Sequence, residues 1–551
     1  MKKAIRNLLH RLKRFFGIIS LLAAVTMPIE ASAQQPIPVK GNIGITGSGG
    51  IGVNVSGEGH LETEVHGPVS AFGEVSIAAN EPVIQEQFVY GASTEAWAFF
   101  INGGASTSSA SNMLVLNSGA ETFSHAAARS RHSLTYKAGQ GALVRFTAMF
   151  STGAVATSQL AGLGNSESFV GFGTGVTDGN FGVFRSSGGL RDVNRLSVDT
   201  KSSNSQTVTI TLNGQAFSCT VTNGATINTT ANEIGDCDYT TMYPGWITEV
   251  EGSTVVFIPL TPGPMTGTFS ASFPTSGVGT FSEVTAGVNP NIEQINQASW
   301  NIDVMDGTAS TSNPSGMLLD KSKLQVYAIK YQYLGAGALE FMAEDASSGE
   351  LVPVHRIRYA GREYSPSLSN PTMPITFSVR NVGVAGNKTL SVASAGAFVQ
   401  GEIKDLGQQR SYQVSKTGFG TSFIPILTLR NSRIRGSRIN QSELVPIGIS
   451  ISNTGGKAME FEVREQSDLG NSAYFSYVST NTSAAKVDFS ATTALRGIAR
   501  LTRGVSSGAS ADIDLQRYGF TIEAGNQIVI LIKANSATTD ATVSLQWVER
   551  Q

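Results

Sequence analysis

Four arginines form a basic cluster in the C-terminal part of the sequence: Arg430, Arg433, Arg435 and Arg438. A solvated loop would explain this group. Guanidinium groups gathered in this way could also contact an anionic glycan or the phosphates of a lipopolysaccharide. We therefore predict that Arg433, Arg435 and Arg438 bind a ligand.

Two carboxylates, Asp303 and Asp306, precede Gly307 and a loop that is rich in threonine and serine. Calcium prefers several oxygen ligands from one loop, so this pair is a candidate Ca²⁺ site. The spacing does not match the EF-hand pattern, and capping of a turn by the two side chains is the alternative interpretation. The sequence indicates no other cofactor.

The two cysteines of the chain, Cys219 and Cys237, follow an alternating segment (207–212) and an Asn-Gly pair typical of a hairpin turn. A hairpin here could bring the two thiols together. One disulfide would then stabilise the fold by about 3 kcal/mol in an oxidising compartment. Two buried free thiols are the alternative. Neither interpretation is catalytic, because the sequence has no CxxC motif and two cysteines alone make a poor zinc site.

The other titratable residues do not form a recognisable catalytic set. His355 shares one face of an alternating strand with Ile357 and Tyr359, which indicates a packed side chain. Glu344 and Asp345 are adjacent, so they would point to opposite faces of a strand and could not act as a glycosidase pair. No GxSxG, P-loop, HExxH or dinucleotide motif stands between a strand and a helix. We therefore predict that the protein is not an enzyme.

Strands must position these residues, because the sequence is rich in glycine and in alternating apolar segments. The 551 residues include 60 Gly, and only 15% of the residues are charged. Apolar segments such as 97–101, 142–150, 254–258 and 324–334 are separated by glycine-containing turns, a pattern typical of β-sandwiches and jelly rolls. The sequence thus predicts an all-β fold with little helix. Its net charge of −2 provides no basic field for nucleic acid.

The patterns divide the chain into five segments. The first, 1–33, combines basic residues, a short apolar run and an Ala31-Ser32-Ala33 pattern, which is typical of a signal peptide cleaved after Ala33. An N-terminal peptide that inserts into a larger assembly is the alternative. The other predicted segments are a Gly-rich β stem (34–78), a lectin-like β-sandwich (79–290), a β-domain (291–405) and a C-terminal β-sandwich (406–551).

Three stretches, 136–184, 300–356 and 423–547, include Trp300-Asn-Ile-Asp303 and a Gly-Ala-Gly break at 335–337. In this order they resemble largely uncharacterised virion surface and fibre-type proteins of tailed phages and large DNA viruses, over about residues 80–551. The resemblance implies a β-rich body that decorates a particle or engages a host. Those proteins seldom need export, so the leader keeps a bacterial surface protein open. Through strand 144–150 and hairpin 208–214, the first sandwich also resembles laminin-G and concanavalin-like lectin folds.

These observations predict a non-enzymatic attachment or display protein, on a virion surface or exported from a cell. Its partners would be a host-surface glycan or receptor, bound by loops between strands. Several copies acting together would strengthen weak sites, so we also predict a homo-oligomer, a trimer. The alternatives are a secreted bacterial adhesin of the same architecture and a polysaccharide-degrading enzyme with its two acids on separate strands.

Overall fold

The computed structural model describes residues 80–550, except for residues 166, 225, 384–385, 402–406, 466, 471–474, 480–481 and 496, together with residues 54–55 and 61–62. The chain divides into two units, Met1–His66 and Gly67–Gln551. In the first unit, β1 (Asn54–Val55) pairs antiparallel with β2 (Leu61–Glu62). The predicted signal peptide (1–33) and the rest of the predicted stem (34–78) lie outside the described residues. Everything below concerns the second unit.

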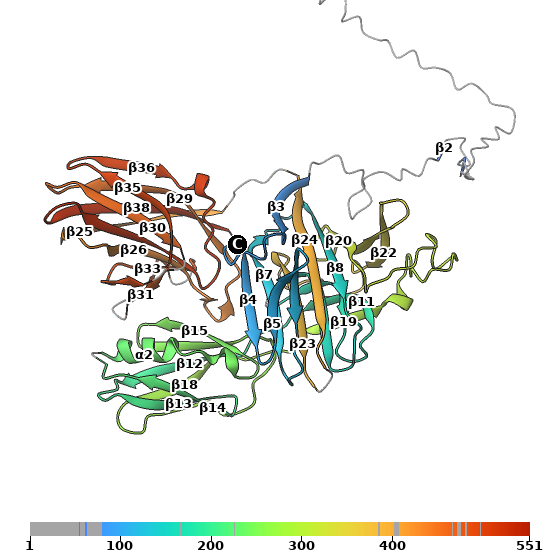
Figure 1. The fold of residues 1–551 in the computed structure, drawn as a ribbon, viewed down its shortest axis with the longest axis horizontal. Helices are drawn as coiled ribbons and strands as arrows, with labels where there is room; N and C mark the ends of the chain where they lie inside the picture. The colour runs from blue at the N-terminus through green and yellow to red at the C-terminus, as the bar shows by residue number, and fades with distance from the viewer. Residues whose placement is uncertain are drawn as a thin grey trace, which may run out of the picture. The chain divides into compact units, whose positions relative to one another are not determined.

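Antiparallel sheets make up nearly all regular structure in the described residues of this unit (Figure 1). The one α-helix among them is α2 (Ile227–Gly235). The predicted all-β class is therefore confirmed. Within this described part, no helix combines the length and the apolar character needed to cross a membrane.

Two large sheets form the first sandwich. One sheet runs, in spatial order, through β19 (Asn291–Asn296), β11 (Phe181–Ser187), β10 (Phe169–Thr174), β9 (Thr157–Gly164), β23 (Met373–Asn381), β7 (His125–Leu134) and β4 (Trp97–Asn102). The other runs through β22 (Leu351–Ile357), β21 (Leu339–Glu344), β20 (Gln325–Tyr331), β8 (Gly141–Phe150), β24 (Thr389–Gln400), β6 (Met113–Asn117) and β5 (Ser106–Ala110), and β3 (Asn80–Gln87) pairs with β24.

Period-two alternation places one face of each strand in the core between these sheets. In β8, Phe146 and Phe150 are buried whereas Arg145 points outward and is exposed. From the opposite sheet, Phe181 packs on Phe150 with 5.1 Å between ring centroids, and Phe172 packs on Phe146 at 6.5 Å. Buried aromatic pairs of this kind supply much of the apolar area that holds two sheets together.

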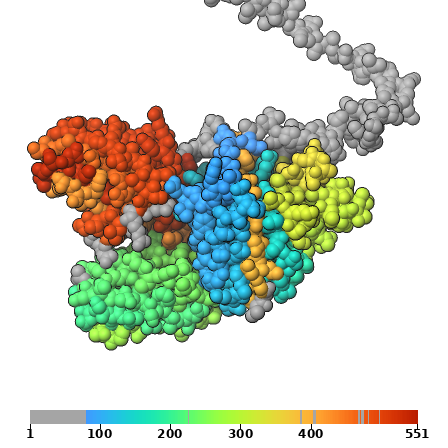
Figure 2. Space-filling model, in the orientation of Figure 1, coloured from blue at the N-terminus to red at the C-terminus, as the bar shows by residue number. Residues whose placement is uncertain are grey.

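The first sandwich is assembled from two separated stretches of chain, 80–187 and 291–400. Strand β23 lies between β9 and β7, and β24 lies between β8 and β6. In Figure 2 the orange strip of β24 accordingly runs between blue and teal segments from the first half of the chain. The sequence-based boundary at residue 290 therefore falls inside one sandwich. Alternation along each strand could not reveal this, because it does not specify the partner strand.

Residues 190–288 leave the first sandwich and form a separate β-body, which we call the insert. Leu190 and Val288 exchange both backbone hydrogen bonds where the insert begins and ends. One of its sheets has the order β15 (Trp246–Glu251), β16 (Thr254–Pro259), β12 (Val193–Thr200) and β18 (Val278–Thr285). The other has the order β14 (Gln215–Val221), β13 (Gln206–Leu212) and β17 (Ser270–Ser272). Helix α2 packs on this body, and the insert has its own apolar core.

The C-terminal sandwich occupies residues 408–550 and has its own apolar core around Trp547, Phe461 and Leu429. One sheet has the order β25 (Gln408–Phe419), β38 (Thr539–Arg550), β29 (Glu443–Asn453) and β36 (Ser510–Asp514). The other has the order β32 (Ser476–Tyr477), β33 (Ala485–Asp488), β26 (Ile424–Asn431), β37 (Gln527–Ala534), β30 (Met459–Glu465) and β35 (Ile498–Val505). Two short pairs complete it, β27 (Ile434–Arg435) with β28 (Arg438–Ile439), and β31 (Asp468–Leu469) with β34 (Ala494–Leu495).

Cys219 and Cys237 are joined in a disulfide that ties β14 to the end of α2 in the insert. Replacing both with serine should lower the free energy of unfolding of the insert by about 3 kcal/mol, because the unfolded chain gains conformational freedom. Chemical denaturation followed by the fluorescence of Trp246, the tryptophan of the insert, would measure the loss. The control is Ser218→Ala at an exposed position of the same strand, which should change little. An unchanged midpoint in the double variant would contradict a stabilising role for this bond.

Candidate functional site

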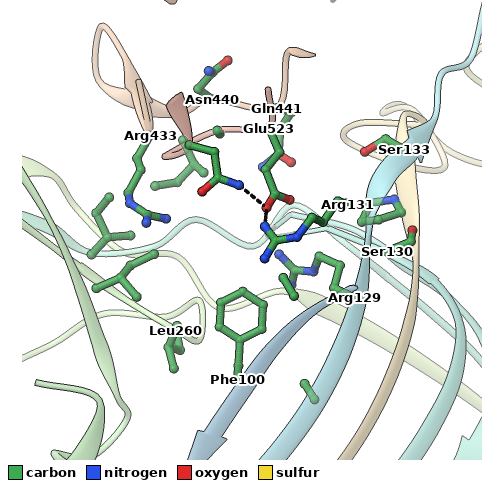
Figure 3. A pocket seen from close by; sticks show the side chains of 18 of the residues that line it. Phe100, Arg129, Ser130, Arg131, Ser133, Leu260, Arg433, Asn440, Gln441 and Glu523 are labelled. Carbon is green, nitrogen blue, oxygen red and sulfur yellow. Dashed lines mark hydrogen bonds and ion pairs between the residues drawn. The ribbon is translucent and has the colours of Figure 1, made fainter. Parts of the chain in front are cut away.

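A pocket of about 270 Å³ is lined by side chains of the first sandwich, the insert and the C-terminal sandwich (Figure 3). Figure 3 shows the guanidinium groups of Arg129, Arg131 and Arg433 directed toward a common space above the ring of Phe100. A fourth arginine, Arg191 of the insert, also lines this space. We call it the arginine pocket.

Strand β7 supplies two of the arginines through its alternation. Ala126 and Ala128 point into the core of the first sandwich, so His125 and Arg129 lie on the opposite face. The register of β7 against β23 shifts near Ser130, whose hydroxyl donates to the carbonyl of His132 and accepts from the amide of Ile375. This bulge lets Arg131 line the same pocket as Arg129.

The other two arginines come from positions where the chain changes direction. Arg191 lies at the start of the insert, where its backbone bridges to Gly263, and only 7% of it is exposed. Arg433 precedes the β27–β28 hairpin and packs against Gly525. A side-chain carbon at residue 525 would lie 2.3 Å from the guanidinium carbon of Arg433, and the φ of Gly525 is +94°. Glycine is therefore needed at 525 for both reasons.

Positive charge exceeds negative charge in the arginine pocket. Arg131 is ion-paired with Glu523, whose carboxylate also accepts a hydrogen bond from the side-chain amide of Asn526. By contrast, the buried Nε atoms of Arg129 and Arg191 have no hydrogen-bond partner. Burial, followed by repulsion from Arg129 and Arg433, lowers the pKa of Arg191 to about 9, although the charge of Glu167 opposes the shift. Burying a cation with unused donors beside like charges is unfavourable unless an anion compensates it.

Two carboxylates and one histidine complete the titratable lining. Glu443 is buried and accepts a hydrogen bond from the amide of Ser133 at 2.7 Å. Burial raises the pKa of Glu443 to about 7, and burial also raises the pKa of Glu523. His125 is held neutral, since burial and then the charges of Arg380 and Arg129 lower its pKa to about 3. At neutral pH the pocket therefore keeps a net positive charge.

The three arginines that the sequence predicted as ligand-binding residues lie near one another but in two hollows. Arg433 lines the arginine pocket, whereas Arg435 and Arg438 line a neighbouring hollow on the other side of the β27–β28 hairpin. Arg430 lies over the ring of Phe475, with 3.6 Å from its guanidinium carbon to the ring centroid.

Sequence patterns alone did not identify Arg129, Arg131 and Arg191 as residues of the site. The alternation of residues 125–133 could have indicated that Arg129 and Arg131 lie on one face of a strand. Nothing in the sequence linked Arg191 to them, because the two β-bodies that carry these residues come together only in the folded chain.

The predicted calcium ligands are both occupied by hydrogen bonds within their loop. Asp303 accepts from the amides of Met305 and Ser315, and Asp306 accepts from the amide of Thr308 and the side chain of Asn313. This arrangement corresponds to the turn-capping alternative. Among the described residues, no group of three or more His, Cys, Asp or Glu side chains could hold a metal ion. His355 accepts a hydrogen bond from the amide of Asn301, outside the arginine pocket.

Glu443 should make the stability of the protein depend on pH. Its pKa of about 7 in the folded protein lies above the ordinary 4.5, so the folded protein holds this proton more tightly than the unfolded chain. Glu443 therefore contributes stability at low pH that is lost as the pH rises from about 4.5 through 7.

Relative to Glu443→Gln, the wild type should lose about 1–3 kcal/mol of unfolding free energy over this pH range. Denaturation curves at several pH values would measure the difference. The control Glu350→Gln, at an exposed position, should give the same pH dependence as the wild type. Parallel curves for Glu443→Gln would contradict this account of the buried carboxyl.

No protein-family model and no curated protein matches this sequence. Among solved structures, the chain is similar to the endo-β-1,4-glucuronan lyase of the fungus Trichoderma reesei (6% identity, 57% of this chain and 95% of that chain, TM-score 0.25). It is also similar to the Emp46p carbohydrate recognition domain (8%, 59% and 100%, TM-score 0.24) and to the lectin UEA-II in complex with galactose (9%, 58% and 100%, TM-score 0.22). At these TM-scores we infer no function from the similarity.

Proposed function

We propose that this protein is a non-enzymatic surface protein that binds an acidic glycan through the arginine pocket. The observation that carries the proposal is Arg191. Its guanidinium is buried, its Nε has no hydrogen-bond partner, and the repulsion from Arg129 and Arg433 outweighs the attraction of Glu167. A carboxylate, sulfate or phosphate group on the ligand would accept from these donors and neutralise the excess charge.

The apolar part of the lining supports a sugar as the carrier of that anion. Beside the guanidinium groups lie the ring of Phe100 and the side chains of Leu260 and Ile439. Asn440 also lines this wall, with its side-chain amide donating to the side chain of Asn431 and the carbonyl of Ser432. A pocket that combines apolar area with a few polar groups can both hold and orient a small ring.

We place this binding activity in attachment, on a virion surface or on an exported protein that has lost its first 33 residues. A secreted bacterial adhesin with the same pocket is the alternative setting. Action as a homotrimer would raise the strength of attachment, because linked copies bind far more tightly than one site alone. Light scattering on the purified full chain would measure the oligomeric state, and mass spectrometry would locate the N-terminus.

A second candidate function, cleavage of a polysaccharide, is favoured by the two carboxylates of the pocket. Glu443 and Glu523 both line it, and a general acid needs a raised pKa. However, Glu523 is engaged by Arg131, and one oxygen of Glu443 accepts from the amide of Ser133. These contacts join the C-terminal sandwich to β7, so we assign the two carboxylates a structural role.

The binding proposal predicts an unusual pair of effects for Arg191→Met. Loss of charge-assisted hydrogen bonds, worth about 1.5–3 kcal/mol, should weaken binding of an acidic sugar such as galacturonic acid about 10- to 100-fold. The unliganded variant should be at least as stable as the wild type, because a buried, repelled charge is removed. Calorimetric titration and thermal unfolding would measure the two quantities.

Arg362→Gln is the matched control, since Arg362 is exposed and does not line the arginine pocket. It should change neither binding nor stability. Unchanged affinity in Arg191→Met, or tighter binding of a neutral sugar than of its acid, would overturn the proposal.

The non-enzymatic part of the proposal predicts that the full chain does not shorten an acidic polysaccharide. Polygalacturonate incubated with the wild type should keep its length in size-exclusion chromatography and gain no reducing ends. Cleavage that disappears in both Glu443→Gln and Glu523→Gln would instead establish the second candidate function.

A further inference from the structure

The arginine pocket has a neighbour across the β27–β28 hairpin. This second hollow measures about 510 Å³, and residues 439–442 line both spaces. Its remaining lining comes from Arg435, Gly436 and Arg438 of the hairpin and from Glu167, Ser369, Asn370 and Thr372 of the first sandwich. The two hollows therefore share one wall, which is four residues of a single chain segment.

The second hollow has the chemistry of an open anion site. Arg438 is exposed, and Arg435 donates to the carbonyl of Thr482 at 3.2 Å, which fixes its direction. Glu167 is the one acidic side chain in its described lining. Burial raises the pKa of Glu167 overall, and the charges of Arg438 and Arg191 oppose this shift. Arg191, Glu167 and Arg438 also line one small cavity, so the three residues are neighbours.

The lining also discriminates between kinds of polyanion. Hydroxyl and amide groups of Ser369, Asn370, Thr372 and Gln441 line the second hollow, and none of its described lining residues is aromatic. Hydroxyl-rich sugars suit such a lining. Single-stranded nucleic acid usually needs aromatic rings for base stacking and a broad basic field, whereas this chain has a net charge of −2.

We propose that the ligand is an acidic polysaccharide that carries anionic groups along its chain, and that it spans both hollows across the hairpin. One anionic group enters the arginine pocket beside Arg129, Arg191 and Arg433. A second group lies against Arg435 and Arg438. This inference rests on the proposed binding function. It adds that an acidic polysaccharide binds more tightly than a single acidic sugar.

The test compares the affinity of the 551-residue protein for galacturonic acid with its affinity for a hexamer of galacturonic acid. The wild type should bind the hexamer at least about 10-fold more tightly than the monosaccharide, because two charged sites act on one molecule. The double variant Arg435→Gln/Arg438→Gln should lose that gain and leave binding of the monosaccharide unchanged. Arg191→Met should weaken binding of both, and Arg362→Gln should affect neither. Thermal unfolding of each variant would check that it is folded.

The outcomes separate the two proposals. Equal affinity for monosaccharide and hexamer, both dependent on Arg191, would overturn the spanning inference and leave the binding function standing. If neither sugar binds, both proposals fail. The inference would also be overturned if an oligothymidylate of equal charge bound as tightly as the hexamer. Such a result would show that the site responds to charge alone and not to the sugar that carries it.

Discussion

The pairing of β24 with β8 is the constraint on which the rest of the structure depends. It joins Leu143 to Phe398, residues that are far apart along the chain, and completes a sheet that neither stretch could form alone. Because 80–187 and 291–400 must pair in this way, residues 190–288 cannot continue the sheets and emerge as the insert. The start of the insert then carries Arg191 to the outer side of β7, where the arginine pocket forms.

Polar contacts hold the C-terminal sandwich against both other bodies. Lys486 is buried between Glu249 and Glu251 of the insert, with 2.7 Å between its Nζ and Glu249. Burial opposes the charge of Lys486, but these carboxylates raise its pKa overall. A small apolar cluster of Val193, Val256, Ile258 and Ile434 lies beside these ion pairs. Buried ion pairs determine how two surfaces dock more than they add stability. They therefore suit a contact between β-bodies that together line a pocket.

Neighbouring carboxylates neutralise the charges of the arginine pocket only in part. Glu249 has Lys486 and Arg131 has Glu523, but Arg129 and Arg191 each retain a buried Nε without a partner. Such unfavourable features cluster at functional sites, where a ligand or an ordered water can supply the missing partner. The hairpin between the two hollows places further guanidinium groups beside this excess charge, so one segment of chain can serve two anionic groups.

The sequence by itself determined the all-β class, the burial of alternating residues such as Phe146 and Phe150, and the clustering of arginines near residue 433. These features depend on local periodicity and composition, which any single strand or loop expresses. Only the tertiary structure decided that residues 291–400 complete the first sandwich, that Arg191 joins Arg129 and Arg433, and that Arg435 and Arg438 lie in a separate hollow. Strand partners and meeting points between bodies arise from contacts across long stretches of chain, and alternation along one strand carries no record of them.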